Sequence, residues 1–278
     1  MTAIDTAALD TALAAIAADI TVADPGAGPR QLRLSSGEVH AFGSAESPTS
    51  GLTECIYARH YCRPGQEMPQ ARPSDAAFLE TLRAVCASSG QGTTIRDGIT
   101  SGHYFLLGRP VVAANTGRQV RFYWNLLPDG AAGLLAMLAA RLDRRRLPFQ
   151  AKVPSTVAGY DRADAGVLYC AAEDVACVID IVLETQAALA TWLRPDLPLF
   201  TRALAPGLGF AESPQGGESF GMARSRLLAE GLLQARQGTD AIEAMRARLA
   251  GYGLRFDALE RNAGTAYPYP PPIAAADR

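Results

Sequence analysis

The sequence contains a single lysine, Lys152, although lysine and arginine together account for 26 of its 278 residues. Arginine stays protonated in proteins, whereas a buried lysine can lose its proton and act as a base. Composition alone leaves two interpretations open: Lys152 is a retained functional amine, or it merely survived a coding bias towards arginine. Only three histidines are present, so a histidine-rich metal centre is not expected.

Long apolar runs and a strong net charge are also missing. No stretch reaches the roughly 20 apolar residues that a membrane-spanning helix needs. The net charge of −2 argues against a general binder of nucleic acid or of membrane surfaces. The N-terminus is rich in alanine but carries Asp5, Asp10 and Asp19, which is not typical of a signal peptide.

Cysteine is scarce and odd in number, which suits a reducing compartment. Two pairs are each seven residues apart, a spacing that does not match the close pairs of a zinc site. We therefore expect buried structural thiols and no metal site. The five cysteines are Cys55, Cys62, Cys86, Cys170 and Cys177.

The segment 149–153 alternates between apolar and polar residues, which predicts a strand. Side chains two residues apart share one face of a strand, so Gln150 and Lys152 should lie on the same face. Pro154 has no N–H to donate to a neighbouring strand and should end this one.

A polar turn that contains Tyr160, Arg162 and Asp164 separates this strand from a second apolar run at 167–170. A turn between two strands could bring Arg162 back towards Lys152. Asp164 is close enough in sequence to hold the guanidinium in place.

Apolar spacing and end signals predict the other elements. His60 lies off the apolar stripe of its helix and is expected to be a surface or capping group. Helices are expected over 5–19, 51–63, 74–86, 130–143, 174–193, 239–250 and from Glu218 or Ser219 onward. Strands are expected over 93–97, 102–107, 110–114 and 120–127, with a hairpin at 115–117, and within 30–42 around a turn at 35–37. This organisation suggests a helical region over 1–90, an α+β core over 91–262 and a proline-rich tail over 263–278, within one compact domain.

Several arginines on separate segments could bind a phosphate bidentately. Arg121 shares a strand face with Tyr123, and a solvated role is the stronger expectation for it. Arg224 falls in the first two turns of its helix, where a cation is unfavourable unless an anion binds there. Alternatively, Glu218 and Glu230 balance the arginines of this helix at the surface. Arg202 is a third candidate.

An amine that can lose its proton, placed beside arginines, suits the β-elimination of phosphate from phosphoserine or phosphothreonine. The amine would remove the Cα proton. The arginines would stabilise the charge of the departing phosphate.

Five segments together resemble the HopA-type effector family, and the resemblance spans about 100–235. The family was named for type III secreted proteins of plant pathogens. Its relatives also occur as the lyase component of class V lanthipeptide and thioamitide biosynthesis. The N-terminal third resembles the family mainly in Ile56-Tyr57 and His60-Tyr61. The segments are VRFYWNL (120–126), LPFQAKV (147–153), YDRADAGVLY (160–169), LFTRALAPGLGFAESP (199–214) and ESFGMARSRLLAEGL (218–232).

The resemblance implies an α+β fold, with a mixed or antiparallel sheet flanked by helices, that is related to phosphothreonine lyases. It implies elimination of phosphate from a phosphorylated, leader-bearing precursor peptide, which gives dehydroalanine or dehydrobutyrine without a metal or cofactor. An aminoglycoside-phosphotransferase-like kinase would act first and is the expected partner; nucleic acid and membranes are not. A cytoplasmic location is expected, with secretion as an effector as the alternative.

On that pattern Lys152 is the general base. Phosphothreonine lyases use a histidine as the acid, and no histidine lies beside Lys152 in its strand. His103 is the first choice for this role and Tyr160 the second, unless phosphate leaves without an acid. The expected substrate-binding residues are Arg162, Arg202, Arg224, Arg121, Asp164 and Ser219. The rival hypothesis is a non-catalytic protein that binds a phosphopeptide or a kinase.

Overall fold

The computed structural model describes residues 6–23, 31–41, 47–65, 73–88, 94–97, 102–108, 118–235, 240–266 and 268–269. The chain divides into two compact units, and each combines segments that are far apart in sequence. Unit 1 comprises Met1–Cys62 and Glu218–Ala266, and unit 2 comprises Arg63–Gly217 and Tyr267–Arg278. These boundaries cut the chain at other places than the expected 1–90, 91–262 and 263–278.

Unit 2 is built on a seven-stranded sheet with the order β4-β5-β7-β8-β6-β10-β9, in which neighbouring strands run antiparallel. The α+β class is therefore confirmed, and the sheet is antiparallel. Strands β9 and β10 were not among the predicted elements. The strands are β4 (Thr94–Asp97), β5 (His103–Leu107), β6 (Gln119–Trp124), β7 (Gln150–Pro154), β8 (Gly166–Ala171), β9 (Arg202–Ala205) and β10 (Leu208–Glu212).

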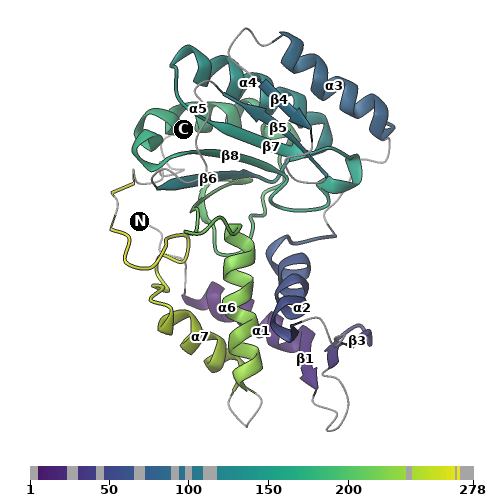
Figure 1. Cartoon of the computed structure of the whole chain (residues 1–278), viewed down its shortest axis with the longest axis vertical. Helices are drawn as coiled ribbons and strands as arrows, with labels where there is room; N and C mark the ends of the chain where they lie inside the picture. Colours follow the sequence, from purple (N-terminus) through teal and green to yellow (C-terminus); the bar gives the residue numbers. More distant parts are fainter. Residues whose placement is uncertain are drawn as a thin grey trace. The chain divides into compact units, whose positions relative to one another are not determined.

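Three helices, α3 (Asp75–Ser88), α4 (Ala131–Arg144) and α5 (Val175–Ala188), lie together on one side of this sheet (Figure 1). Alternate strand residues point towards them and form the core with the apolar stripes of the helices. From β6 these residues are Val120, Phe122 and Trp124, and from α4 they include Leu134, Leu135, Leu138 and Leu142. Each such side chain contributes roughly 1.5–3 kcal/mol when it is fully buried.

The ends of these helices follow local chemistry. Ser74 Oγ accepts a hydrogen bond from the Ala77 N–H at 3.3 Å, as expected for the start of α3. The helix expected to continue to residue 193 ends at Ala188, because Leu189 leaves helical geometry with φ −103° and ψ 9°. A short 3₁₀ turn, η5 (Ala190–Trp192), follows it. The other 3₁₀ turns are η2 (Pro128–Gly130), η3 (Val157–Tyr160) and η4 (Ala172–Asp174).

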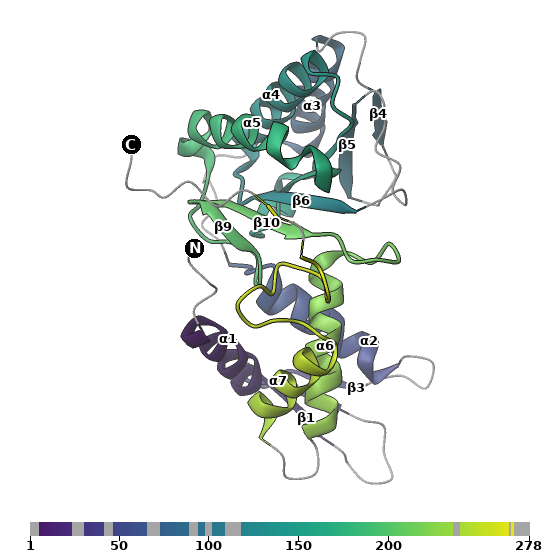
Figure 2. The same ribbon diagram turned by 90° about the vertical axis from the view of Figure 1, so that its left-hand side faces the viewer.

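Unit 1 combines a three-stranded antiparallel sheet with helices from both ends of the chain. Helix α6 packs against α2 and α7, and α1 packs against α7 (Figure 2). The sheet consists of β1 (Ile20–Ala23), β2 (Gln31–Leu34) and β3 (Val39–Ala41). The helices are α1 (Thr6–Asp19), α2 (Pro48–Ile56), the π-helix η1 (Tyr57–Tyr61), α6 (Phe220–Gln234) and α7 (Ala241–Gly251).

Asp19, at the end of α1, accepts hydrogen bonds from several side chains of unit 1. Arg59 donates through Nε and Nη2, both at 2.8 Å, and Ser35 Oγ donates at 2.5 Å. His60 Nε2 lies 2.9 Å from the same carboxylate, and its side chain is only 15% exposed. Of the two expected roles, a surface position is therefore wrong for His60, because the π-helix turns its ring towards the end of α1.

The cysteines are less uniform than expected. Cys62 and Cys170 are buried, Cys55 is half-buried and Cys177 is exposed. The expectation of buried thiols is thus wrong for Cys177. The side chain of Cys86, the strand expected over 110–114, the hairpin at 115–117 and most of the proline-rich tail lie outside the described residues.

Candidate functional site

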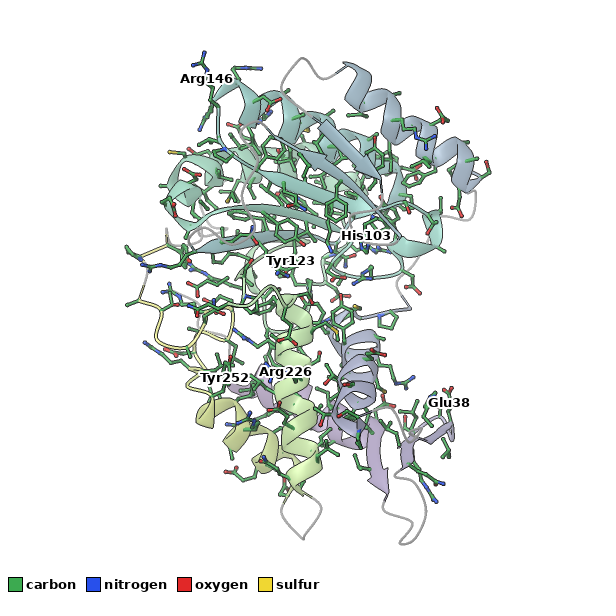
Figure 3. All side chains as sticks on the ribbon, viewed as in Figure 1. Glu38, His103, Tyr123, Arg146, Arg226 and Tyr252 are labelled. Atoms are coloured by element: carbon green, nitrogen blue, oxygen red, sulfur yellow. The ribbon has the colours of Figure 1, made fainter. Side chains whose placement is uncertain are left out.

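Lys152 lies on the face of the seven-stranded sheet that points away from α4 and α5. Its backbone pairs with Phe105 of β5 and Val167 of β8, and Val167 pairs in turn with Tyr123 of β6. Residues that face each other across antiparallel strands share one side of the sheet, so these four side chains form a row. We call this side the Lys152 face. Figure 3 shows the side chains of His103 and Tyr123 on it.

A second row on the Lys152 face carries the next basic group. Gln150 pairs with Tyr169, and Tyr169 pairs with Arg121. Arg121 therefore lies two strands and one row away from Lys152, roughly 12 Å between Cα atoms at ordinary sheet spacings. The side chain of Lys152 is partly exposed.

Arg121 is held firmly within the sheet. It is only 8% exposed, and its Nε donates a hydrogen bond to Ser213 Oγ at 2.9 Å. Its guanidinium carbon lies 5.1 Å from the centre of the Tyr169 ring, which is a cation–π distance. The expectation of a solvated Arg121 is therefore wrong, because neighbouring strands place a hydroxyl and an aromatic ring beside it.

His103 begins β5 and shares the Lys152 face. It pairs with Pro154, while Phe105 pairs with Lys152, so His103 and Lys152 are diagonal neighbours across the β5–β7 pair. The imidazole centre lies 6.5 Å from that of the Phe105 ring. The first choice for the acid thus lies on the same surface as the expected base.

Tyr160 belongs to the core and not to the Lys152 face. It is fully buried, and its ring meets that of Phe78 edge-on at 5.5 Å. Its hydroxyl donates to the Pro154 carbonyl at 3.2 Å, and burial raises the pKa of Tyr160 well above its ordinary value. Tyr160 was the second choice for the acid, and this choice is corrected here. Its buried hydroxyl stabilises the end of β7 instead.

Arg162 and Asp164 form the expected pair in the loop between β7 and β8. Arg162 donates through Nε at 2.5 Å and through Nη2 at 2.9 Å to the two carboxylate oxygens. The loop connects Pro154 with Gly166 and so leaves from the end of the sheet that holds Lys152. This topology keeps Arg162 a candidate for the same site.

Arg202 does not share the strand position of Lys152. In β9 it pairs with Phe210, whose ring belongs to the helix-covered core. Side chains of paired residues point to the same side, so Arg202 starts from the opposite side of the sheet to Lys152. Arg202 was proposed as a phosphate ligand before its pairing with Phe210 was known. That pairing, which the sequence did not predict, decides on which side of the sheet Arg202 lies.

Arg224 and Ser219 belong to unit 1, and both have structural contacts there. Arg224 is 2% exposed and donates to the carbonyl oxygens of Leu259 at 3.0 Å and Arg261 at 2.6 Å. Its guanidinium also lies over the Phe220 ring at 4.6 Å. Ser219 caps α6 by accepting a hydrogen bond from the Met222 N–H at 3.2 Å. The expectation of a phosphate-binding Arg224 is corrected by these carbonyl contacts.

Arg226 follows the alternative that the sequence left open. It pairs with Glu230 at 2.9 Å and with Glu218 at 3.3 Å.

Sequence reasoning missed Arg194, which stabilises the loops at the same end of the sheet. Its guanidinium donates to Asn125 Oδ1 at 3.0 Å, to the Leu126 carbonyl at 3.2 Å and to the Tyr160 carbonyl at 2.6 Å. Burial lowers the pKa of Arg194. In the sequence, the one feature that marks Arg194 is its position directly before Pro195.

Among the described residues, no group of three or more histidine, cysteine, aspartate or glutamate side chains is arranged to hold a metal ion. None of the helices in the described segments combines the length and the apolar character that a bilayer crossing requires.

The fold and this face define a class: an antiparallel α+β protein with an amine, an imidazole and a guanidinium on one sheet surface. The model of the HopA1 effector protein family matches residues 96–259, and the chain belongs to this family. A search of curated proteins found no match.

Two solved structures have a similar fold. The structure of the effector protein from Pseudomonas syringae pv. tomato strain DC3000 has a TM-score of 0.60 and 18% identity, covering 78% of this chain and 95% of that one. The structure of the effector protein from Pseudomonas syringae pv. syringae strain 61 has a TM-score of 0.59 and 18% identity, covering 78% and 96%.

Proposed function

We propose that the protein is a lyase that eliminates phosphate from phosphoserine or phosphothreonine. The observation that carries the proposal is the shared sheet face of Lys152, the sole lysine, with Arg121 and His103. An amine on this face can act as the base that removes the Cα proton, and a guanidinium can bind the phosphate. The substrate would be a phosphorylated precursor peptide made by a separate kinase, as in peptide natural-product biosynthesis.

The proposed step needs only groups of the chain and the substrate. The Lys152 amine removes the Cα proton, and the electron pair of that bond forms the Cα=Cβ double bond. The Cβ–O bond breaks, and phosphate leaves with its electron pair. Arg121 and Arg162 stabilise the charge that develops on the phosphate oxygens. His103, on the same face, is the candidate that gives a proton to the leaving group.

The test is incubation of the phosphopeptide with the purified protein, without ATP and with a chelator present. We expect mass spectrometry to show loss of phosphoric acid from the peptide. Lys152→Arg keeps the charge but cannot act as a base, so the rate should fall by about 10²–10⁴-fold. The control is retained affinity of Lys152→Arg for the phosphopeptide.

An unchanged phosphopeptide, both with the wild-type protein alone and with its kinase partner added, would contradict the lyase proposal. Retained binding without elimination would identify the rival function, a phosphopeptide-binding protein. An elimination rate for Lys152→Arg equal to that of the wild type would remove Lys152 from the role of base.

A further inference from the structure

Ser213 owes its position beside Arg121 to the sheet itself. Its N–H donates to the Gln119 carbonyl at 2.8 Å, which extends the β10–β6 ladder one residue beyond Glu212. Ser213 is therefore two residues from Ala211, which pairs directly with Arg121. Ala211 is too small to fill the space above its position, so the Arg121 side chain can run along β10 to reach the serine.

The hydrogen-bond direction at Ser213 is set by Gln119. Ser213 Oγ donates its proton to Gln119 Oε1 at 3.0 Å and accepts from Arg121 Nε at 2.9 Å. A hydroxyl whose proton is already engaged presents its lone pairs to the arginine. The guanidinium carbon of Arg121 lies over the Tyr169 ring of the neighbouring strand. Arg121 is thus held by a hydroxyl on one side and by an aromatic ring on the other.

We propose that Ser213, Gln119 and Tyr169 are positioning residues that hold the Arg121 guanidinium for a phosphomonoester bound on the Lys152 face; this inference rests on the proposed function. A guanidinium fixed before binding loses less side-chain freedom when phosphate arrives than a mobile one does. Its fork also fits the planar, bidentate contact that phosphate oxygens favour. The three side chains act on the substrate through Arg121 and do not need to touch it.

Two pairs of variants separate positioning from general support. Ser213→Ala removes the hydroxyl, whereas Ser213→Thr keeps it. Tyr169→Leu removes the ring, whereas Tyr169→Phe keeps it. Thr81→Ala, on an exposed position of α3 whose hydroxyl donates to Ala77 O, is the unrelated control. Thermal unfolding of every variant identifies any that fails to fold.

Two readouts are compared for one peptide in its phosphorylated and unphosphorylated forms. The first is affinity by fluorescence polarisation, which does not depend on turnover. The second is KM and kcat for phosphate release. We expect Ser213→Ala and Tyr169→Leu to lower affinity for the phosphopeptide and to raise KM about fivefold to tenfold, the effect of losing one such contact. Because Arg121 also stabilises the departing phosphate, kcat should fall as well. Affinity for the unphosphorylated peptide should change less than about twofold, and Ser213→Thr and Tyr169→Phe should restore the wild-type values.

The inference is overturned if Ser213→Ala weakens both peptide forms equally, or weakens neither. It is also overturned if both substitutions change kcat alone. A wild-type protein that releases no phosphate contradicts the proposed function, yet the difference in affinity between the two peptide forms still tests the positioning of Arg121. If Ser213→Ala does not fold, the affinities of Tyr169→Leu and Tyr169→Phe for the phosphopeptide are compared instead, and equal affinities would overturn the inference.

Discussion

At the scale of single residues, arginines that look alike in the sequence have different roles in the structure. Arg224 is buried with its guanidinium on two backbone carbonyls, whereas Arg226, two residues later, pairs with glutamates and is a third exposed. The carbonyls that hold Arg224 belong to residues more than thirty positions later in the chain. Spacing along the helix therefore could not distinguish a structural arginine from a phosphate ligand.

Arg224→Met should destabilise the protein by about 2–4 kcal/mol, because it removes the donor from the buried Leu259 carbonyl and from the partly buried Arg261 carbonyl. The matched control, Arg226→Met, should cost at most about 1 kcal/mol, as expected for a partly exposed ion pair. Urea unfolding followed by circular dichroism measures both. Equal stability of the two variants would show that the carbonyl contacts of Arg224 contribute little.

At the scale of elements, most helices and several strands could be predicted because each has its own local signal. Helix α4 carries an apolar stripe at helical spacing, and β7 alternates between buried and partly exposed residues. Strand β10 is buried at every position and contains a glycine, so it lacks the alternation that identifies a strand. The side of the sheet on which Arg202 lies is set by the pairing of β9 with β10, which was not predicted.

Part of the candidate site could be predicted for the same reason. The alternation of apolar and polar residues over 149–153 correctly predicted that Gln150 and Lys152 share one face of a strand. The short spacing between Arg162 and Asp164 indicated their ion pair. The contacts of Arg121 with Ser213 could not be predicted, because the two residues are 92 positions apart. Long-range strand pairing, which local sequence does not encode, brings them together.

The packing of α6 gives a prediction at this scale. A Cβ added to Gly221 would lie 2.4 Å from Tyr61 Cε1 and 2.6 Å from Tyr57 Cε2, and these two rings stack at 5.2 Å. Gly221→Ala should therefore destabilise the protein by about 1–3 kcal/mol, although alanine favours helices more than glycine does. Gly251→Ala, where no atom of the described residues outside the local helix lies within 4 Å of the added Cβ, should be neutral or slightly stabilising. Thermal melting of the two variants checks the contrast, and a stabilised Gly221→Ala would contradict it.

At the scale of the whole molecule, the chain enters unit 2 after Cys62 and returns to unit 1 at Glu218. Unit 1 therefore cannot form until both of its segments, 1–62 and 218–266, have been made. Asp19 and His60 come from its first segment, and their hydrogen bonds connect α1, the β2–β3 turn and the π-helix. Acid sensitivity of the folded chain should be concentrated there.

The hydrogen bond from Arg59 lowers the pKa of Asp19 well below its usual range, and burial lowers the pKa of His60. The unfolded chain then binds protons more readily than the folded one at both groups, so stability falls on acidification. The loss from His60 begins below about pH 6.5, and that from Asp19 begins below about pH 4.

Asp19→Asn should cost about 1–3 kcal/mol at pH 7, and its difference from the wild type should shrink as the pH falls below about 4. Urea unfolding from pH 8 to pH 3 measures this, with Asp257→Asn, in an exposed pair with Arg255, as the control that should change little. A difference that stays constant across this range would mean that the charge of Asp19 does not stabilise the fold.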